Sequence, residues 1–294
     1  MQGVVSVIIA WCNTEVDLLI QALTSVDRQT YEQIEIVVCN DGSTSEKKDE
    51  FLRKSQQFKK EFTLIENDKN EGIPSARNKS VSSSSGDWLV WLDADDTLEE
   101  NCVSRLFNAA NGSHKDMIVG ECIVHEKDRT LRRKPKTYFD LAKQYFRTPY
   151  DPFLLNVISV QPQIVSRKAF FQIGGFNIEY HLAEMTEFFL RFVVKCGLDR
   201  LGFIEDAVYF YNRKQDNSVS ANRELLFQYR KRALIYYKQE LGIEVDDICY
   251  IGRSSNTGMQ SYVPIIADKI ILPDYLKIME HQISLGGSNH GTKN

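Results

Sequence analysis

The stretch GDWLVWLDADD, residues 86–96, joins a hydrophobic run to three closely spaced carboxylates. Every residue from 88 to 92 is aromatic or aliphatic, which is typical of a strand buried on both faces of an α/β sheet. The run stops at Asp93, Asp95 and Asp96. Neighbouring carboxylates repel one another and lose hydration on burial, so this group needs either a cation or an open turn.

The segments before this strand predict an alternation of strands and helices. Runs rich in β-branched or other apolar residues predict three earlier strands, at VVSVII (4–9), IEIVVC (34–39) and FTLIE (62–66). Helical patterns lie between them, at 16–26 with Asn13 as N-cap, in a charged segment that ends near residue 60, and at 73–86 with Gly86 at its end. This order predicts an α/β fold with a mostly parallel sheet flanked by helices.

Polar residues follow the carboxyl end of each predicted strand: Asn13, Asp41, Asp68 and Asp93 to Asp96. In open α/β sheets, ligands bind in the crevice beyond these strand ends. Mg²⁺ and Mn²⁺ prefer oxygen ligands and bind through one or two carboxylates together with substrate phosphates. We therefore predict that Asp93 and Asp95 hold such a cation, and that Asp96 forms a turn and caps the helix that follows.

The second half of the chain is more mixed. Patterns in it predict strands at 116–126, 206–213 and 248–252, a Gly174-Gly175 turn, and helices at 184–197 and after residue 223. We expect residues 1–100 and 101–223 to form the two halves of one domain, and 224–294 a helical C-terminal extension with a disordered tail. The basic segment 127–136 favours a solvated hairpin, with anionic lipid or a phosphate-bearing acceptor as alternative contacts.

Composition narrows the function classes. Hydrophobic residues make up 43% of the 294-residue chain, charged residues 26%, and the net charge of −4 gives no sign of nucleic-acid binding. No run approaches the roughly 18 apolar residues of a membrane span, and no secretory signal is evident. The six cysteines lack paired spacing, which indicates reduced thiols and no zinc site. We expect a cytoplasmic protein, with peripheral contact at the inner face of the membrane left open and no indication of oligomeric state.

Six segments together resemble family 2 glycosyltransferases, which are nucleotide-sugar-dependent enzymes of the GT-A fold. They occur in the family's order: VSVIIAWCN (5–13), QALTSVDRQTYEQIEIVVCNDGST (21–44), NEGIPSARNKSV (70–81), GDWLVWLDADD (86–96), VSRKAFFQIGGFN (165–177) and EMTEFFLRF (184–192). The resemblance implies a GT-A fold, in which residues 1–100 form the nucleotide-sugar-binding half and residues 101–223 a mixed, acceptor-binding half of the same domain. It also implies an inverting transfer from a nucleotide diphosphate sugar.

The resemblance also assigns roles on the donor side. It implies that Asp41 binds the nucleobase, usually uracil, that Asp93 lies near the ribose and the metal, and that Asp95 coordinates Mn²⁺ or Mg²⁺ on the diphosphate. Arg77 would pair with phosphate, although a salt bridge across the helix surface is an equal alternative. Asp41 can also cap an Asx turn.

Several positions depart from the family pattern. The aromatic residue expected at the end of the first strand is replaced by Cys12, so that base stacking falls to Trp11 or is absent, and Asn13 completes the donor-binding set. Gln215 occupies a position where the family often has a histidine, for which His181 is a candidate substitute. A glycine-rich phosphate loop, which a nucleotidyltransferase or a dehydrogenase would need, does not follow the first strand.

The catalytic base is the least regular position. The family's Glu-Asp pair is Glu184-Met185 here, and methionine cannot accept a proton. We predict that Glu184 is the base. Glu187 is the alternative, but its spacing from Arg191 suits a helix ion pair. The predicted function is metal-assisted transfer of a sugar, from a UDP-linked donor, to a saccharide or lipid-linked saccharide in surface polysaccharide or glycoconjugate assembly. A nucleotide-sugar-binding protein or partner subunit with impaired catalysis is the alternative.

Overall fold

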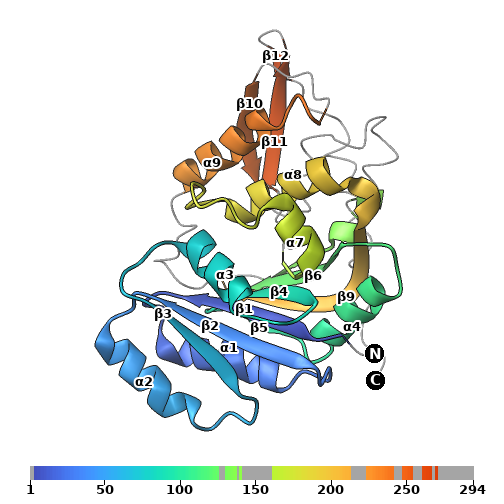
Figure 1. Ribbon diagram of the computed structural model, residues 1–294. Helices are drawn as coiled ribbons and strands as arrows, with labels where there is room; N and C mark the ends of the chain where they lie inside the picture. The colour runs from blue at the N-terminus through green and yellow to red at the C-terminus, as the bar shows by residue number, and fades with distance from the viewer. Residues whose placement is uncertain are drawn as a thin grey trace.

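The computed structural model describes residues 3–125, 130–137, 139–140, 161–212, 223–241, 247–253, 260–266 and 269–270. Within these residues, nine strands form one curled sheet in the order β3-β2-β1-β4-β8-β6-β9-β5, with β7 paired to β6 (Figure 1). Helices cover both faces of this sheet, as the alternation in the sequence predicts.

The first four strands form the parallel part of the sheet. They are β1 (Val5–Trp11), β2 (Ile34–Asp41), β3 (Phe62–Asn67) and β4 (Trp88–Asp93), and β1 lies between β2 and β4. The helices that connect them are α1 (Val16–Asp27), α2 (Ser45–Ser55) and α3 (Ile73–Ser82). All four predicted strands are confirmed, and each ends at the same edge because the strands are parallel.

The second half of the chain extends the same sheet. Its strands are β5 (Thr97–Leu98), β6 (Met117–His125), β7 (Thr130–Arg133), β8 (Gln163–Ser166) and β9 (Leu201–Asn212). Its helices are α4 (Cys102–Asn111), α7 (Arg167–Ile173) and α8 (Glu184–Cys196), followed by the short 3-10 helix η1 (Leu198–Arg200). Strand β8 pairs antiparallel with both β4 and β6, which makes the sheet mixed at this point.

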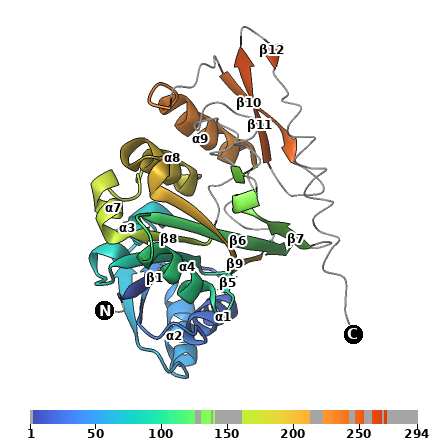
Figure 2. The ribbon, with the colours of Figure 1, turned by 90° about the vertical axis from the view of Figure 1, so that its right-hand side faces the viewer.

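Strand alternation separates two hydrophobic cores. Val7 and Ile9 of β1 face one core with α1, α2 and α4, whereas Ile8 faces the other core with α3, α7 and α8. The helices of the two cores lie on opposite sides of the sheet (Figures 1 and 2). Which core a side chain faces therefore follows from its parity along the strand.

The C-terminal extension contains a sheet as well as a helix. After α9 (Arg223–Tyr236), strands β10 (Asp247–Arg253), β11 (Gln260–Ile266) and β12 (Lys269–Ile270) pair antiparallel, apart from the main sheet (Figure 1). Ala233 and Leu234 of α9, and Tyr237 directly after it, pack into the core of α7 and α8. The helix α9 and the strand β10 confirm the helix predicted after residue 223 and the strand predicted at 248–252. The predicted disordered tail lies outside the described residues.

Three local predictions about helix ends are wrong. Asn13 does not cap α1, because its φ is 54° and Glu15 occupies the N-cap position. Helix α3 ends at Ser82, four residues before Gly86. Asp96 forms the predicted turn, since its N–H donates to the Asp93 carbonyl at 3.1 Å, but α4 begins only at Cys102, after β5.

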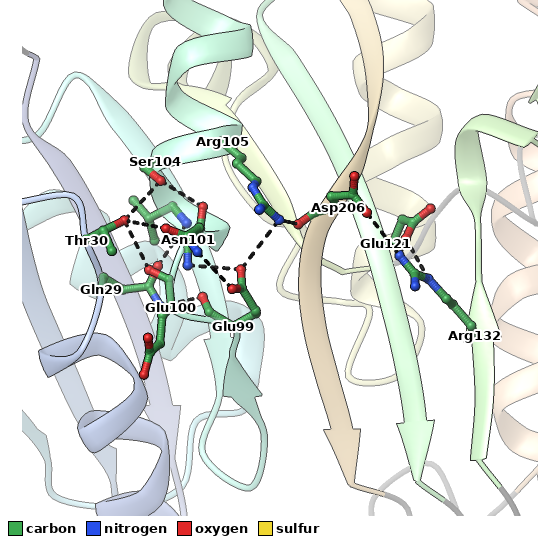
Figure 3. A network of polar contacts seen from close by, with 11 residues as sticks. Gln29, Thr30, Glu99, Glu100, Asn101, Ser104, Arg105, Glu121, Arg132 and Asp206 are labelled. Atoms are coloured by element: carbon green, nitrogen blue, oxygen red, sulfur yellow. Dashed lines mark hydrogen bonds and ion pairs between the residues drawn. The ribbon is translucent and has the colours of Figure 1, made fainter. Parts of the chain in front are cut away.

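Polar contacts hold β9 at an irregular point (Figure 3). Asp206 has a φ of 65°, which is unfavourable for a residue with a side chain, and the pairing of β6 with β9 shifts register beside it. Arg105 of α4 donates to the Asp206 carbonyl from one side. From the other side Arg132 of β7 binds the Asp206 carboxylate and the buried carboxylate of Glu121. The predicted hairpin in the basic segment is thus present, and Arg132 is neutralised within the protein.

Within the part of the chain that the structure describes, no helix is both long enough and apolar enough to cross a bilayer.

Candidate functional site

The carboxylates that follow β2 and β4 lie on the same face of the sheet. Side chains an even number of positions apart on a strand lie on the same face of the sheet. Asp41 therefore shares a face with Val37, and Asp93 shares one with Trp91. Val37 and Trp91 both belong to the core of α3, α7 and α8. The two aspartates therefore face the side from which α3 and α8 approach. Strand alternation in the sequence accounts for this placement.

Arg77 joins two of the predicted site residues. From α3, its Nη2 donates to Asp93 Oδ1 at 2.6 Å and its Nη1 donates to Glu184 Oε1 at 2.8 Å. The guanidinium also lies over the ring of Phe176, 5.2 Å from the centroid. The Arg77 side chain is only 3% exposed, whereas that of Asp93 is 39% exposed. Sequence left open whether Arg77 binds phosphate or a surface carboxylate, and the structure gives it a buried ion pair with two acids.

Among the residues that the structure describes, no cationic side chain pairs with the Asp95 carboxylate. Burial raises its pKa to about 6, and the charge of Asp93 contributes further. In the described chain, only its own backbone amide is a hydrogen-bond partner of this carboxylate. A carboxylate in this state favours either a proton or a metal ion.

Asp96 has a different environment. It accepts hydrogen bonds from the Tyr209 hydroxyl at 2.6 Å and from the Asn212 amide at 2.7 Å, and it is 1% exposed. Burial, together with Asp93 and Asp95, raises its pKa well above the ordinary value. Tyr209 also accepts from the Asp93 amide at 3.2 Å. Tyr209 thus positions the acidic turn, and no feature of the segment DAVYFYNR pointed to that role because its partners are about 115 residues away.

The Asp41 carboxylate holds the loop that precedes α3. Its Oδ1 accepts from the Asn67 side chain at 2.7 Å and from the Glu71 amide at 2.9 Å, and its Oδ2 accepts from the Gly72 amide at 2.9 Å. Lys79 binds the carbonyl oxygen of the Asn67 side chain at 2.8 Å. Asp41 is therefore fixed in place by residues 26 to 31 positions away. The local Asx-type bond predicted for it is made by Asn40 instead, whose side-chain oxygen accepts from the Ser43 amide at 2.9 Å.

Trp11 is a wrong prediction for the donor site. It is 1% exposed, its ring packs 5.3 Å from that of Phe51 in α2, and its indole N–H donates to the Thr14 carbonyl. Its parity matches that of Ile9, so it faces the opposite core. The next residue, Cys12, lies near the site instead: Asn70 donates to its sulfur at 3.1 Å, and burial and Asp41 raise the pKa of its thiol.

Asn13 lies at the margin of this region. Its side-chain oxygen accepts from the Thr44 amide at 3.0 Å, its own amide donates to the Ser43 hydroxyl, and its carbonyl accepts from Lys47. These bonds tie the loop after β1 to the loop after β2. Asn13 therefore fixes the position of these two loops at the carboxyl ends of β1 and β2, and its predicted contact with donor stays a prediction.

In the first turn of α8, the Glu184 side chain points toward Arg77, whereas that of Met185 packs into the core. Ala183, in the left-handed conformation at φ 58°, precedes the helix, and Glu184 is 13% exposed in its side chain. Its Oε1 binds Arg77, and the described residues supply no partner for Oε2. Met185 packs against the core of α7 and α8, with its sulfur 3.7 Å from the Gln161 side-chain nitrogen. Of these two residues, Glu184 is the one that lies near Asp93, because both carboxylates bind Arg77.

Glu187 has the structural role that its spacing predicted. Arg191 donates to both of its oxygens, at 2.7 and 2.8 Å, and the Tyr237 hydroxyl donates at 2.7 Å. This group lines a cavity of about 480 Å³ between α8, α9 and the loop after α7. Its contacts thus belong to the packing of α8 against α9, and the alternative that Glu187 is the base is not supported.

Further predicted metal ligands are not gathered here. Gln215 lies outside the described residues. His181 is exposed, and its Nδ1 lies 3.3 Å from the position that a Cβ on Gly72 would take, which is on the Asp41 side of the crevice. The described residues contain no group of three acids, histidines or cysteines arranged to hold a metal. Any cation at Asp93 and Asp95 would therefore complete its coordination with ligand oxygens or water.

The arrangement of the mixed sheet and its flanking helices is that of GT-A glycosyltransferases. TarS of Staphylococcus aureus, solved in complex with UDP, superimposes with a TM-score of 0.57 at 15% identity, over 80% of this chain and 73% of that one. Mannosyltransferase PcManGT of Pyrobaculum calidifontis, solved with GDP-Man and Mn²⁺, gives 0.62 at 15% identity, over 98% of this chain and 71% of that one. These structures establish the fold.

The sequence establishes the family. The profile of "Glycosyl transferase family 2" matches residues 6–174, more than half of the chain, and the chain belongs to that family. Among curated relatives, Glycosyltransferase GlyA of Streptococcus pneumoniae is 28% identical over 211 residues, which are 71% of this chain. The chain spans only 28% of the length of GlyA.

Proposed function

We propose that this glycosyltransferase-family chain transfers a sugar from a nucleotide diphosphate donor, with UDP as the nucleotide, to an acceptor hydroxyl with inversion. The observation that carries the proposal is the juxtaposition of Asp93 and Glu184, 91 positions apart, on a single buried guanidinium. It gives one crevice an acid suited to a donor-bound cation and an acid suited to a proton from the acceptor.

The donor side rests on three aspartates. Asp41, at the end of β2, would contact the nucleobase, while Asp93 and Asp95 would hold Mn²⁺ or Mg²⁺ together with the diphosphate. Two features of Asp95 support a cation at this position: its pKa is raised, and it has no cationic partner in the described chain. The bound cation would neutralise negative charge on the leaving diphosphate. The Mn²⁺ complex of PcManGT and the UDP complex of TarS favour the same chemistry.

The acceptor side rests on Glu184. The acceptor oxygen forms a bond to the anomeric carbon while the bond from that carbon to the diphosphate oxygen breaks, and the nucleoside diphosphate leaves with the electron pair. Glu184 takes the hydroxyl proton through the oxygen that Arg77 does not bind. One displacement of this kind inverts the anomeric centre. The acceptor is proposed to be a saccharide or lipid-linked saccharide of a surface polysaccharide or glycoconjugate, used on the cytoplasmic side of the membrane.

Met185 favours a second candidate. Its thioether stands where the family has its aspartate base, and it packs into the core. If Glu184 does not replace that base, the chain would bind nucleotide sugar without transferring it efficiently. The two candidates predict the same binding and different turnover.

Titration calorimetry with UDP, GDP and dTDP, each with Mn²⁺ or with EDTA, tests the binding on which both candidates depend. We expect UDP to bind in the presence of Mn²⁺, and Asp95→Ala to abolish the part of the affinity that depends on metal. Asp17→Ala is the matched control, because Asp17 is an exposed aspartate whose ion-pair partner is Lys54 of α2. Release of UDP from UDP-sugars then separates the candidates. Absence of binding by any of the three nucleotides contradicts the proposed function.

A further inference from the structure

Arg77 is placed unlike a phosphate ligand. Its two terminal nitrogens donate to Asp93 and Glu184, and the face of its guanidinium rests on Phe176. The residue is 2% exposed. A phosphate bound through both terminal nitrogens would need the same pair that the two carboxylates occupy.

The two carboxylates have no other means of keeping this arrangement among the described contacts. Asp93 follows β4, and Glu184 begins α8 after a residue at φ 58°. Two acids this close repel each other, and one buried cation between them turns that repulsion into attraction. The planar fork of arginine also fixes the spacing and the orientation of the oxygens that bind it.

We propose that Arg77 is a positioning residue that holds the carboxylate of Glu184 at a fixed place relative to Asp93, and so aligns the base with the metal-bound donor. This inference rests on the proposed function. Each acid uses one oxygen for Arg77, which leaves Glu184 Oε2 for the acceptor proton and Asp93 Oδ2 for the donor side. Arg77 itself contacts neither reactant. This anchoring supplies at position 184 the ordered carboxylate that Met185 cannot provide.

A set of variants tests the inference: Arg77→Met, Arg77→Lys, Glu184→Gln and the double variant Arg77→Met with Glu184→Gln. Two quantities are measured for each, the Kd of UDP with Mn²⁺ and the kcat of UDP release from the UDP-sugar that the wild type uses, with water as acceptor. We expect Arg77→Met to lower kcat roughly 100-fold, the cost of misplacing a catalytic group by about 1 Å. The Kd of UDP should change much less, by no more than about fivefold, because the guanidinium does not touch the nucleotide.

The double variant gives the sharpest result. If Arg77 acts through Glu184, Arg77→Met should slow the Glu184→Gln protein by no more than about threefold, since residues that act as a unit are not additive. The kcat of Arg77→Lys should lie between those of wild type and Arg77→Met, because an ammonium keeps the positive charge but cannot bind two carboxylates with the planar geometry of a guanidinium. If Arg77→Met does not fold, Arg77→Lys takes its place in the comparison, and its kcat should fall while its Kd for UDP changes much less.

Arg191→Met is the matched control. Arg191 is also a buried arginine with a carboxylate partner on α8, but that partner is Glu187. The Arg191→Met substitution should lower the stability of the protein and leave its kcat within about threefold of wild type. Multiplicative losses in the double variant, an unchanged kcat in Arg77→Met, or a Kd that rises in step with the fall in kcat would overturn the inference. So would a wild type that binds UDP but releases none from any donor, whereas a failure to bind any nucleotide would instead overturn the proposed function.

Discussion

Asp95 gives a pH dependence with a definite sign. Its folded pKa of about 6 lies above the ordinary 3.8, so the fold favours its protonated form. Stability from this group is present at low pH and is lost as pH rises through about 6. In EDTA, Asp95→Asn should therefore raise the free energy of unfolding by roughly 2–3 kcal/mol at pH 7.5 and by much less at pH 4.

Urea unfolding of both proteins at the two pH values measures this difference. Mn²⁺ added with UDP should raise the stability of the wild type and leave that of Asp95→Asn almost unchanged, because binding stabilises only the state that binds. A variant less stable than wild type at pH 7.5 without metal would contradict the environment described for Asp95.

At the scale of single residues, the sequence showed which face of the sheet each strand side chain would occupy, because side chains alternate along a strand. The alternation along β1 places Trp11 with Val7 and Ile9, on the face away from Asp41, so its burial beside Phe51 was foreseeable. The contact of Arg77 with Glu184 was not foreseeable, because it joins residues 107 positions apart on two helices.

Between elements, the Phe176 backbone joins the loop after α7 to Asn78 of α3, and Gly175 lies against this contact. Its φ is 69°, and a Cβ there would lie 2.8 Å from Asn78 Oδ1, the atom that accepts from the Phe176 amide. Gly175→Ala should cost about 2–3 kcal/mol through strain and the close contact. It should also slow UDP release from donor, since Phe176 supports Arg77.

Gly112→Ala is the control for that prediction. Gly112 ends α4 at φ −84°, and its Cβ would approach only the Asn108 carbonyl, at 3.2 Å. Denaturant unfolding compares the two variants. Equal stability of Gly175→Ala and Gly112→Ala would show that the loop relaxes without cost.

Long elements with regular patterns were predictable, and short ones were not. The apolar runs of β1, β2 and β4 are long enough to identify from sequence alone. Strands β5 and β8 have two and four residues, and they exist because β9, β4 and β6 offer them partners. Such strands are determined by tertiary pairing rather than by local sequence.

Across the whole molecule, Arg132 connects the β6–β7 hairpin to β9, because it binds Glu121 of β6 and Asp206 of β9 (Figure 3). Glu121 is 1% exposed, so Arg132→Met would leave a buried carboxylate without its cation and should cost roughly 3 kcal/mol. Adding Glu121→Met should recover most of that loss, since two apolar side chains can replace a buried pair.

Urea unfolding measures both variants, and Lys136→Met is the control because its partner Asp140 is exposed, with an expected cost below about 0.5 kcal/mol. A double variant as unstable as Arg132→Met alone would mean that β9 depends on Arg132 for more than the charge of Glu121, such as its contact with Asp206.

The central claim is that the acids after β4 hold a cation against a nucleotide diphosphate. Crystals grown with UDP and MnCl₂ and measured at the manganese absorption edge test it most directly. We predict an anomalous peak within coordination distance of Asp95, with the diphosphate on its other side and uracil beside Asp41. A nucleotide bound elsewhere, or a nucleotide in the crevice with no manganese at Asp93 and Asp95, would contradict the account.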